Sequence, residues 1–177
     1  MKLKEIFLKR LKEVQGRAVG FRIDEIKLPN HKKATREYLN HPGAVGIIPF
    51  IDKNHVVLVR QYRYPVQEET WEIPAGKLDN KEPLLSCAKR ELEEETGFKS
   101  NHLTKLLSFW PTAAFANEII HIYIAKKLTK GHLNPDEDEF LNAKVWPIKK
   151  VYNAIRSGKI KDSKTIIAFL SYKTFKG

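Results

Sequence analysis

Residues 83–96 form the segment that most constrains how this chain can fold. Pro83 suits a first helical turn and Gly97 suits the position after a last turn, so the segment predicts a helix. At about 100° per residue, one arc of this helix should face a core. The members of that arc are Leu84, Leu85, Ala88 and Leu92. Glu91 and Glu95 lie at the edge of the same arc, where a surface helix would not place carboxylates.

Three glutamates on this predicted helix are close neighbours. Glu94 and Glu95 follow Glu91 by three and four positions, so the three carboxylates lie near one another. Like charges at this spacing repel, and partial burial raises their cost further. A hard divalent cation bound by several carboxylate oxygens removes both problems, which favours a cation site. The alternative is an acidic helix face that binds nothing.

The length and composition of the chain favour one compact domain. Its 177 residues are enough to bury a core, and 42% of them are hydrophobic. No apolar stretch is long enough to cross a bilayer. Charged residues interrupt the N-terminal segment, which lacks the continuous apolar region of a signal peptide. Because Cys87 is also the single cysteine, we expect a cytoplasmic protein.

The formal net charge is strongly positive, at +11. Such a charge can attract phosphorylated small molecules, nucleic acid or a membrane surface, and it can also belong to a solvated surface. The lysines are spread over the chain, and no aromatic RNA-recognition motif accompanies them. We therefore expect neither nucleic acid nor a membrane as the partner.

The rest of the chain mixes segments typical of strands and of helices. Strands are expected at residues 18–29, 33–39, 45–50, 55–61, 70–74, 103–110 and 119–125, and further helices at 147–157 and 161–175. Residues 45–50 and 55–61 flank Asp52-Lys53-Asn54, a turn typical of a hairpin. The first sixteen residues fit either a helix or a strand. Because no regular repeat of strand and helix appears, the fold class is α/β or α+β with a mixed sheet.

The segment Gly76–Phe98, GKLDNKEPLLSCAKRELEEETGF, resembles the Nudix box. The matching positions are Gly76, Glu82, Arg90, Glu91, Glu94, Glu95 and Gly97, followed by the apolar Phe98. The resemblance implies a Nudix fold, in which a mixed β-sheet is sandwiched between helices and antiparallel strands precede it. It also implies a Nudix catalytic domain at residues 43–177 and an N-terminal strand region at residues 1–42. That region is a possible dimerisation arm, so a homodimer is expected.

The resemblance further implies the roles of the box residues. Nudix proteins hold Mg²⁺, or Mn²⁺ in its place, against the diphosphate of a substrate. The matching metal ligands are Glu91, Glu95, Glu94 and the backbone carbonyl of Ala75. Arg90 would orient the glutamates through ion pairs, and Glu82 would brace the start of the helix. Gly97 would cap the end of the helix.

Segments outside the box resemble the branch of ADP-ribose pyrophosphatases and nucleotide-sugar hydrolases. These segments are VLVRQYRYPV, WEIPAGKLD and SFWPTAAFANEIIHIYIAKKL. The resemblance implies metal-dependent hydrolysis of a nucleoside-diphosphate sugar to a nucleoside monophosphate and a sugar phosphate. The implied substrate-binding residues are Arg63, Glu72, Leu78, Glu118 and Phe21. The Ser-Pro-Gly typical of this branch is Thr112-Ala113-Ala114 here, which leaves room for sugars other than ADP-ribose.

The acidic run Asp136–Glu139 matches the loop that supplies a base or a metal ligand in relatives. Glu137 and Glu139 are both candidates for the base, and a solvated charge run is the alternative. Phe21 and Tyr38 lie on strands that relatives use to hold the nucleotide base, although both also suit a core.

Two other functions remain open from the sequence. A Nudix protein can act on RNA 5′ ends, which the positive charge favours, and binding of this kind weakens steeply with salt. The chain could also be a catalytically silent binding module. The presence of all five charged box residues argues against the silent module; they are Glu82, Arg90, Glu91, Glu94 and Glu95.

Overall fold

The computed structural model describes residues 3–134 and 139–176. The chain divides into two compact units. The first consists of Met1–Gly43 with Trp110–Ile119, and the second consists of Ala44–Phe109 with Ile120–Gly177. Within the described ranges, no helix combines the length and the apolar character needed to cross a membrane.

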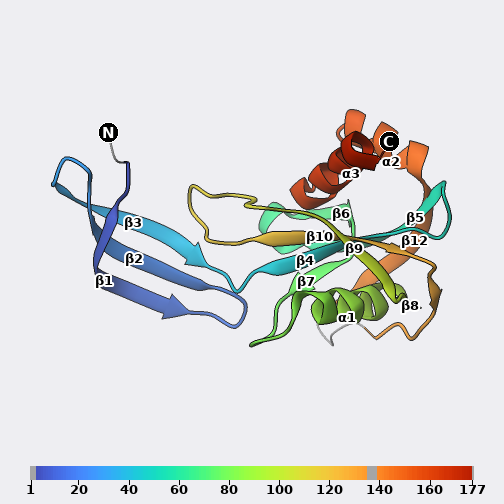
Figure 1. Ribbon diagram of the computed structural model, residues 1–177, viewed down its shortest axis with the longest axis horizontal. Coiled ribbons are helices and arrows are strands. Elements are labelled where there is room, and N and C mark those ends of the chain that lie inside the picture. Colours follow the sequence, from blue (N-terminus) through green and yellow to red (C-terminus); the bar gives the residue numbers. More distant parts are fainter. Residues whose placement is uncertain (1–2, 135–138, 177) are drawn as a thin grey trace. The chain divides into compact units, whose positions relative to one another are not determined.

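The first unit is built on a three-stranded antiparallel sheet, drawn in blue in Figure 1. Its strands, in the order β1-β2-β3, are β1 (Ile6–Gln15), β2 (Gly20–Lys27) and β3 (Lys33–Asn40). The N-terminal segment, which fitted either a helix or a strand, is thus the edge strand β1. At the opposite edge, the backbone of Leu39 bonds to Phe115 and Asn117, which ties residues 110–119 to β3.

A buried carboxylate, Asp24, fixes the first unit internally. It accepts hydrogen bonds from Arg10 Nε at 2.7 Å and from the hydroxyl of Tyr38 at 2.9 Å. The hydrogen bond from Arg10 holds the pKa of Asp24 below its usual range although the side chain is buried. Tyr38 therefore has a structural partner in the sheet.

The second unit contains two larger sheets. The mixed sheet has the order β7-β4-β10-β9 and consists of β7 (Ala75–Lys77), β4 (Ala44–Pro49), β10 (Ile120–Lys126) and β9 (His102–Phe109). The other sheet is antiparallel, with the order β12-β5-β6, and consists of β12 (Leu141–Pro147), β5 (His55–Arg63) and β6 (Glu68–Glu72). A 3-10 turn, η1 (Tyr64–Val66), links β5 to β6, and β8 (Phe98–Lys99) pairs with β11 (Thr129–Lys130).

The turn at Asp52-Lys53-Asn54 is hairpin-like where it joins the two strands: Phe50 and Val56 form an isolated antiparallel bridge, and the N–H of Ile51 donates to the carbonyl of His55 at 3.0 Å. The hairpin does not extend further, because β4 and β5 belong to different sheets. β4 instead pairs in parallel with β10, and β5 pairs with β12 and β6. The turn residues were read correctly, but strands distant in the sequence supply the partners.

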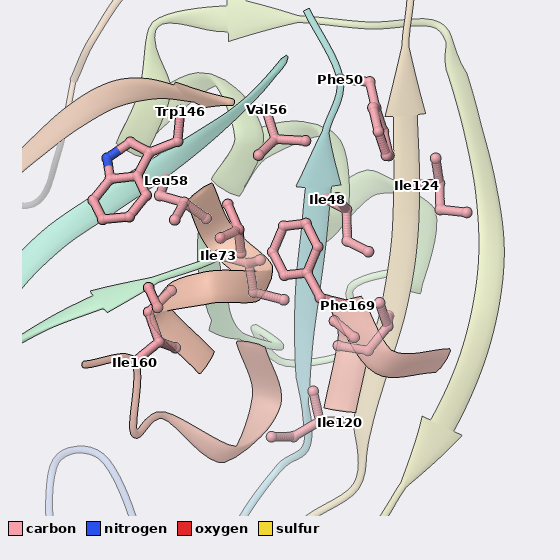
Figure 2. Close-up of a cluster of buried hydrophobic side chains, with 14 of the residues drawn as sticks. Ile48, Phe50, Val56, Leu58, Ile73, Ile120, Ile124, Trp146, Ile160 and Phe169 are labelled. Atoms are coloured by element: carbon pink, nitrogen blue, oxygen red, sulfur yellow. The ribbon is translucent and has the colours of Figure 1, made fainter. Parts of the chain in front are cut away.

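The central strands β4 and β10 are buried on both faces. Val45 and Ile47 of β4 face the cluster that contains Ala88 and Leu92 of α1 (Leu84–Thr96). The alternate residues Ala44 and Ile48 face the second cluster, formed with α2 (Ile148–Arg156) and α3 (Ser163–Lys176). Figure 2 shows Ile48, Phe169 and Trp146 packed in this second cluster. The helices therefore cover opposite faces of the sheet (Figure 1), and the predicted mixed sheet between helices is confirmed.

Helix α1 begins after Pro83 and ends at Thr96, as its sequence predicts. Gly97 follows in the left-handed conformation, at φ 70°, and its N–H donates to the carbonyl of Glu93. One member of the predicted core-facing arc is wrong, since Leu85 is exposed. Leu85 lies in the first turn, where only Leu84 packs partly against the cluster beneath the helix.

Candidate active site

Gly76 and Glu91 meet where β7 passes beside α1. A Cβ atom added to Gly76 would lie 1.9 Å from Oε1 of Glu91, so only glycine leaves room for this carboxylate. Glu91 is 7% exposed. The glycine that opens the box is therefore required by the position of a buried glutamate.

Glu95 lies one turn further along α1 and is 2% exposed. Its Oε2 accepts a hydrogen bond of 2.9 Å from the backbone N–H of Ala75. The backbone of Ala75–Gly76 thus contacts both buried carboxylates of the helix. This arrangement places the predicted ligands Ala75, Glu91 and Glu95 at one point of the second unit.

The two buried carboxylates are costly in their charged form. Burial raises the pKa of Glu91 to about 7, although the charge and hydrogen bond of Arg90 act in the opposite direction. Burial also raises the pKa of Glu95 to about 8, against the hydrogen bond from Ala75, and the charge of Glu91 adds to the shift. Perturbed carboxylates of this kind concentrate at functional sites.

Arg90 connects the glutamates of the box. Its Nη1 lies 2.6 Å from Oε1 of Glu91 and 2.9 Å from Oε2 of Glu94. Its Nε and Nη2 donate to the two carboxylate oxygens of Glu82, at 3.1 and 2.9 Å. A guanidinium with a planar fork of donors can hold several carboxylates in fixed directions. Arg90 thus forms the ion pairs with glutamates that the resemblance implies, and Glu82 is one of its partners.

Glu94 is half-buried at the side of α1, where a hollow of about 350 Å³ opens. The hollow is lined by Arg90, Glu93, Glu94, His132, Leu133 and Asn134. The backbone carbonyl of Glu94 accepts a hydrogen bond from the backbone N–H of Asn134, which joins residue 134 to the helix.

The acidic loop lies partly outside the described residues. Glu137, one of the two candidate bases, falls among residues 135–138 and is not described. Glu139 is exposed, and its negative charge helps to raise the pKa values of Glu91 and Glu95. The structure therefore brings Glu139 within electrostatic range of the buried pair.

The neighbouring carboxylates of Glu91 and Glu95 are oxygen donors of the kind that a hard divalent cation prefers. Among residues 3–134 and 139–176, no three acidic, histidine or cysteine side chains group as ligands of one ion. Magnesium does not need such a cage, because it is commonly held by one or two carboxylates together with water and substrate phosphates. A cation would also offset the cost of charging two buried carboxylates, which Arg90 opposes at Glu91 and which the N–H of Ala75 and the charge of Lys164 oppose at Glu95.

Arg63 and Glu72 form a second charged group in the same unit. Nε and Nη2 of Arg63 donate to Oε1 and Oε2 of Glu72, at 2.9 and 2.7 Å. Glu72 is 1% exposed, and burial alone would raise its pKa. The hydrogen bond from Arg63 and the charge of Lys164 outweigh burial and lower the pKa of Glu72 to about 2. The resemblance thus pointed to two residues that the structure joins as a bidentate ion pair.

Residues at the start of α3, which the sequence did not single out, complete this group. Lys164 donates to Glu72 and, at 3.0 Å, to Asp162. The carboxylate of Asp162 accepts a hydrogen bond from the backbone N–H of Thr165, as in a helix N-cap. The hydroxyl of Thr165 in turn accepts a hydrogen bond from the backbone N–H of Ile73. An aspartate before an apolar helix could have indicated the cap, but no sequence pattern showed that Lys164 turns inward.

The remaining predicted substrate-binding residues have other surroundings. Leu78 packs partly against the cluster beneath α1. Phe21 lies on β2 in the first unit and is partly exposed. Glu118 also belongs to the first unit, where its carboxylate is 3.7 Å from Nδ1 of His41. Their roles at a substrate stay predictions.

Comparison with known proteins identifies the family of this chain. A family model described as the NUDIX domain matches residues 40–169. The methanol dehydrogenase activator of Bacillus methanolicus is 43% identical over 155 residues, which cover 86% of this chain and 84% of that protein. The ADP-ribose pyrophosphatase of Bacillus subtilis (strain 168) is 36% identical over 155 residues, with the same shares covered.

A solved structure shares the fold. The crystal structure of an ADP compounds hydrolase matches with a TM-score of 0.85 at 22% identity, over 99% of this chain and 96% of that one. The family model spans more than half of the chain and includes the whole box. As its box predicts, the chain belongs to the Nudix family.

Proposed function

We propose that this protein is a Mg²⁺-dependent pyrophosphatase of nucleoside-diphosphate sugars such as ADP-ribose, with Mn²⁺ as a possible substitute. The products would be a nucleoside monophosphate and a sugar phosphate. The observation that carries the proposal is the pair of buried carboxylates, Glu91 and Glu95, beside the backbone of Ala75–Gly76. The 36% identity to an ADP-ribose pyrophosphatase supports the class of substrate.

The box residues would hold the cation and orient one another. Glu91, Glu95 and the carbonyl oxygen of Ala75 would be ligands, with Glu94 as a further one. When bound, the ion would offset negative charge on the diphosphate and make water a better nucleophile. Arg90 would keep Glu91 and Glu94 in place while its other nitrogens are fixed by Glu82. Water would add to one phosphorus as the bond to the bridging oxygen breaks.

The proton of the attacking water requires a base. Glu137 and Glu139 are the candidates, since a carboxylate close to the nucleophile can accept this proton. The charge that Glu139 exerts on Glu91 and Glu95 supports Glu139, while Glu137 remains the alternative from the resemblance. Glu139→Gln and Glu137→Gln would separate them, because the variant without the base should lose activity more steeply at neutral than at alkaline pH.

The remaining substrate contacts would come from residues outside the box. Arg63 would donate to a phosphate oxygen, since its guanidinium is held by Glu72 and remains 42% exposed. Leu78, Glu118 and Phe21 would contact the nucleotide or the sugar, as the resemblance implies.

A panel of nucleoside-diphosphate sugars tests the proposed function. The full chain is incubated with each compound and Mg²⁺, and the products are identified by mass spectrometry. We expect release of a monophosphate that stops when the metal is chelated and when Glu95 is replaced by Gln. Absence of turnover over the whole panel would favour the silent module, and turnover confined to RNA 5′ ends would favour the RNA alternative.

We also infer that the first unit mediates a homodimer. Strand β1 carries five exposed large apolar side chains: Ile6, Phe7, Leu8, Leu11 and Val14. Apolar patches of this kind in a soluble protein commonly mark an interaction surface. Light scattering should give twice the mass of one chain, and Phe7→Ser should shift the population toward the monomer.

The 43% identity to a methanol dehydrogenase activator favours a second candidate function, activation of such a dehydrogenase. This candidate is tested by adding the protein to a methanol dehydrogenase and following alcohol-dependent turnover. The Glu95→Gln chain serves as the control, since loss of activation in this variant would tie the effect to the buried carboxylates. No change in dehydrogenase rate would reject the candidate.

A further inference from the structure

Lys164 is a buried cation that lies outside the Nudix box. Its side chain is 11% exposed in the first turn of α3. Lysines are almost never buried unless they are paired. Here the ammonium donates to Oε2 of Glu72 and, at 3.0 Å, to Oδ1 of Asp162. The amino group is therefore fixed between two acids.

The carboxylate of Glu72 has its hydrogen-bonding positions filled from three sides. Oε1 accepts from Arg63 Nε at 2.9 Å and from the hydroxyl of Thr70. Oε2 accepts from Arg63 Nη2 at 2.7 Å and from Lys164. Arg63 thus engages Glu72 through one edge of its planar guanidinium, which fixes the plane of that group.

The other edge of the Arg63 guanidinium remains available. Among the described residues, none accepts a hydrogen bond from Nη1 of Arg63. The side chain is 42% exposed although its partner Glu72 is buried. A guanidinium fixed on one side and open on the other is suited to a phosphate oxygen.

The same part of α3 is attached to the strand that leads into the box. The backbone N–H of Ile73 donates to the hydroxyl of Thr165 at 2.9 Å, next to Lys164. Two residues after Ile73, the N–H of Ala75 donates to Glu95. The start of α3 therefore holds both Glu72 and the backbone that approaches the buried carboxylates.

We propose that Lys164 is a positioning residue for the diphosphate substrate: it holds Glu72, and through Glu72 it orients Nη1 of Arg63 toward a phosphate oxygen. This inference rests on the proposed function for its substrate. Without the ammonium, Oε2 of Glu72 keeps one charged donor instead of two. The guanidinium of Arg63 then turns further toward Glu72, and Nη1 is withdrawn from the substrate.

The test compares three full-length variants, Lys164→Met, Lys164→Gln and Lys161→Met. Lys161→Met is the matched control, because Lys161 pairs at 2.7 Å with Glu68 on the exposed surface three residues away. For Lys164→Met we expect KM to rise about tenfold, the usual effect of losing one charged hydrogen bond. The kcat at saturating Mg²⁺ should fall by a smaller factor than KM rises, because Lys164 donates directly to Glu72 and acts on Glu95 only through its charge. Lys164→Gln keeps a donor without the charge and should raise KM less, and Lys161→Met should leave KM unchanged.

A second readout does not depend on turnover. In an NMR spectrum, the Nε–H resonance of Arg63 can be assigned because it is lost in an Arg63→Lys variant. This resonance should shift in Lys164→Met and stay in place in Lys161→Met. Calorimetry with ADP-ribose should show the same loss of affinity as the rise in KM. If the wild-type chain hydrolyses nothing, the proposed function fails, while the resonance and the calorimetry still decide the role of Lys164.

Three outcomes would overturn the role of Lys164. The first is that Lys164→Met leaves both the KM, or the binding constant, and the Arg63 resonance unchanged. An equal rise of KM in Lys161→Met is the second, because it would show a general effect of charge. A fall in kcat without a change in KM is the third, because it would place the effect in the box. If Lys164→Met does not fold, as thermal unfolding would show, the same criteria apply to Lys164→Gln.

Discussion

The buried carboxylates Glu72 and Glu95 have almost the same exposure but opposite charge environments. Glu72 has two cationic partners, Arg63 and Lys164, and its pKa is lowered to about 2. Glu95 has one direct donor, the backbone N–H of Ala75, and the nearby charge of Glu91 contributes to a pKa of about 8. Burial alone therefore does not decide the state of a carboxylate.

The contrast separates two kinds of buried acid in one unit. The protein's own cations balance Glu72, so this acid can hold another side chain in place. Glu91 is paired with Arg90, which is also bound by Glu82 and Glu94, and the charge of Lys164 acts on Glu95 while the direct hydrogen bond of Glu95 comes from a backbone N–H. An acidic site left with an excess of negative charge is where an external cation is stabilised most.

The largest effect is expected from replacing Glu95 by Gln, which tests the contrast between Glu72 and Glu95 directly. One ligand charge is lost, and we expect turnover to fall about 1,000-fold, as when a preorganised electrostatic group is removed. The amide can still accept the hydrogen bond from Ala75, so the fold should persist. Steady-state rates and urea unfolding give the two results. Near-normal turnover would show that the excess charge at Glu95 has no role in the reaction.

Replacing Glu72 by Gln should affect stability. The variant leaves Arg63 and Lys164 without their shared anion, and breaking a buried pair costs several kcal/mol. Because Arg63 is 42% exposed and can reach water, we expect a loss of about 3 kcal/mol in the free energy of unfolding at pH 7. Urea denaturation measures this change. Glu69→Gln, which breaks the exposed pair with Arg60, is the comparison. If both variants lose the same small free energy of unfolding, the buried, ion-paired Glu72 does not differ from an acid on the surface.

The free energy of unfolding should depend on pH through the lowered pKa of Glu72. Its pKa is about 2 in the folded chain against an ordinary value of 4.5, so the unfolded state binds more protons between these values. Stability from this pair is therefore present above pH 4.5 and lost as the pH falls toward 2. We expect roughly 2–3 kcal/mol of acid-dependent loss. Urea unfolding across this window should show a shallower slope for Glu72→Gln, and an identical slope would contradict the lowered pKa.

The smallest expected effect belongs to Gly76→Ala. The added Cβ would displace the flexible carboxylate end of Glu91, not a rigid backbone. Stability should therefore change by less than about 1 kcal/mol, while activity falls about tenfold, as for changes that misplace a metal ligand. Gly158→Ala, at a positive φ with open space around it, is a control for backbone strain alone. Equal loss of activity in both variants would argue against the contact with Glu91.

Local patterns predicted the elements well, because the signals that define them are local. Pro83 and Gly97 bound α1 within one residue of its observed limits. The apolar runs of β4 and β10 were recognised as strands, and both are buried on two faces. The prediction for Leu85 was wrong because the position of a side chain around the helix axis does not show whether the first turn extends past the core residues that would cover it.

Pairing between distant segments could not be predicted in the same way. The turn at Asp52-Lys53-Asn54 suggested a hairpin, but nothing near it in the sequence indicates that β10 and β12 supply the partners. The box residues were found because their spacing is fixed within one helix and its loop. Lys164 was missed because its partners, Glu72 and Asp162, meet only after α3 packs against the end of β6.

The parallel pairing of β4 with β10 has a consequence for the order of folding. Ala44 is aligned with Ile120, so the two strands are separated by about 75 positions of chain. A sheet built from such remote partners closes late, because a long loop must be ordered first. During synthesis, α1 leaves the ribosome before β10 exists to complete the surface beneath it. We therefore expect the acidic helix to stay sensitive to proteases in nascent chains that end before Ile120, and to become protected once β10 has emerged.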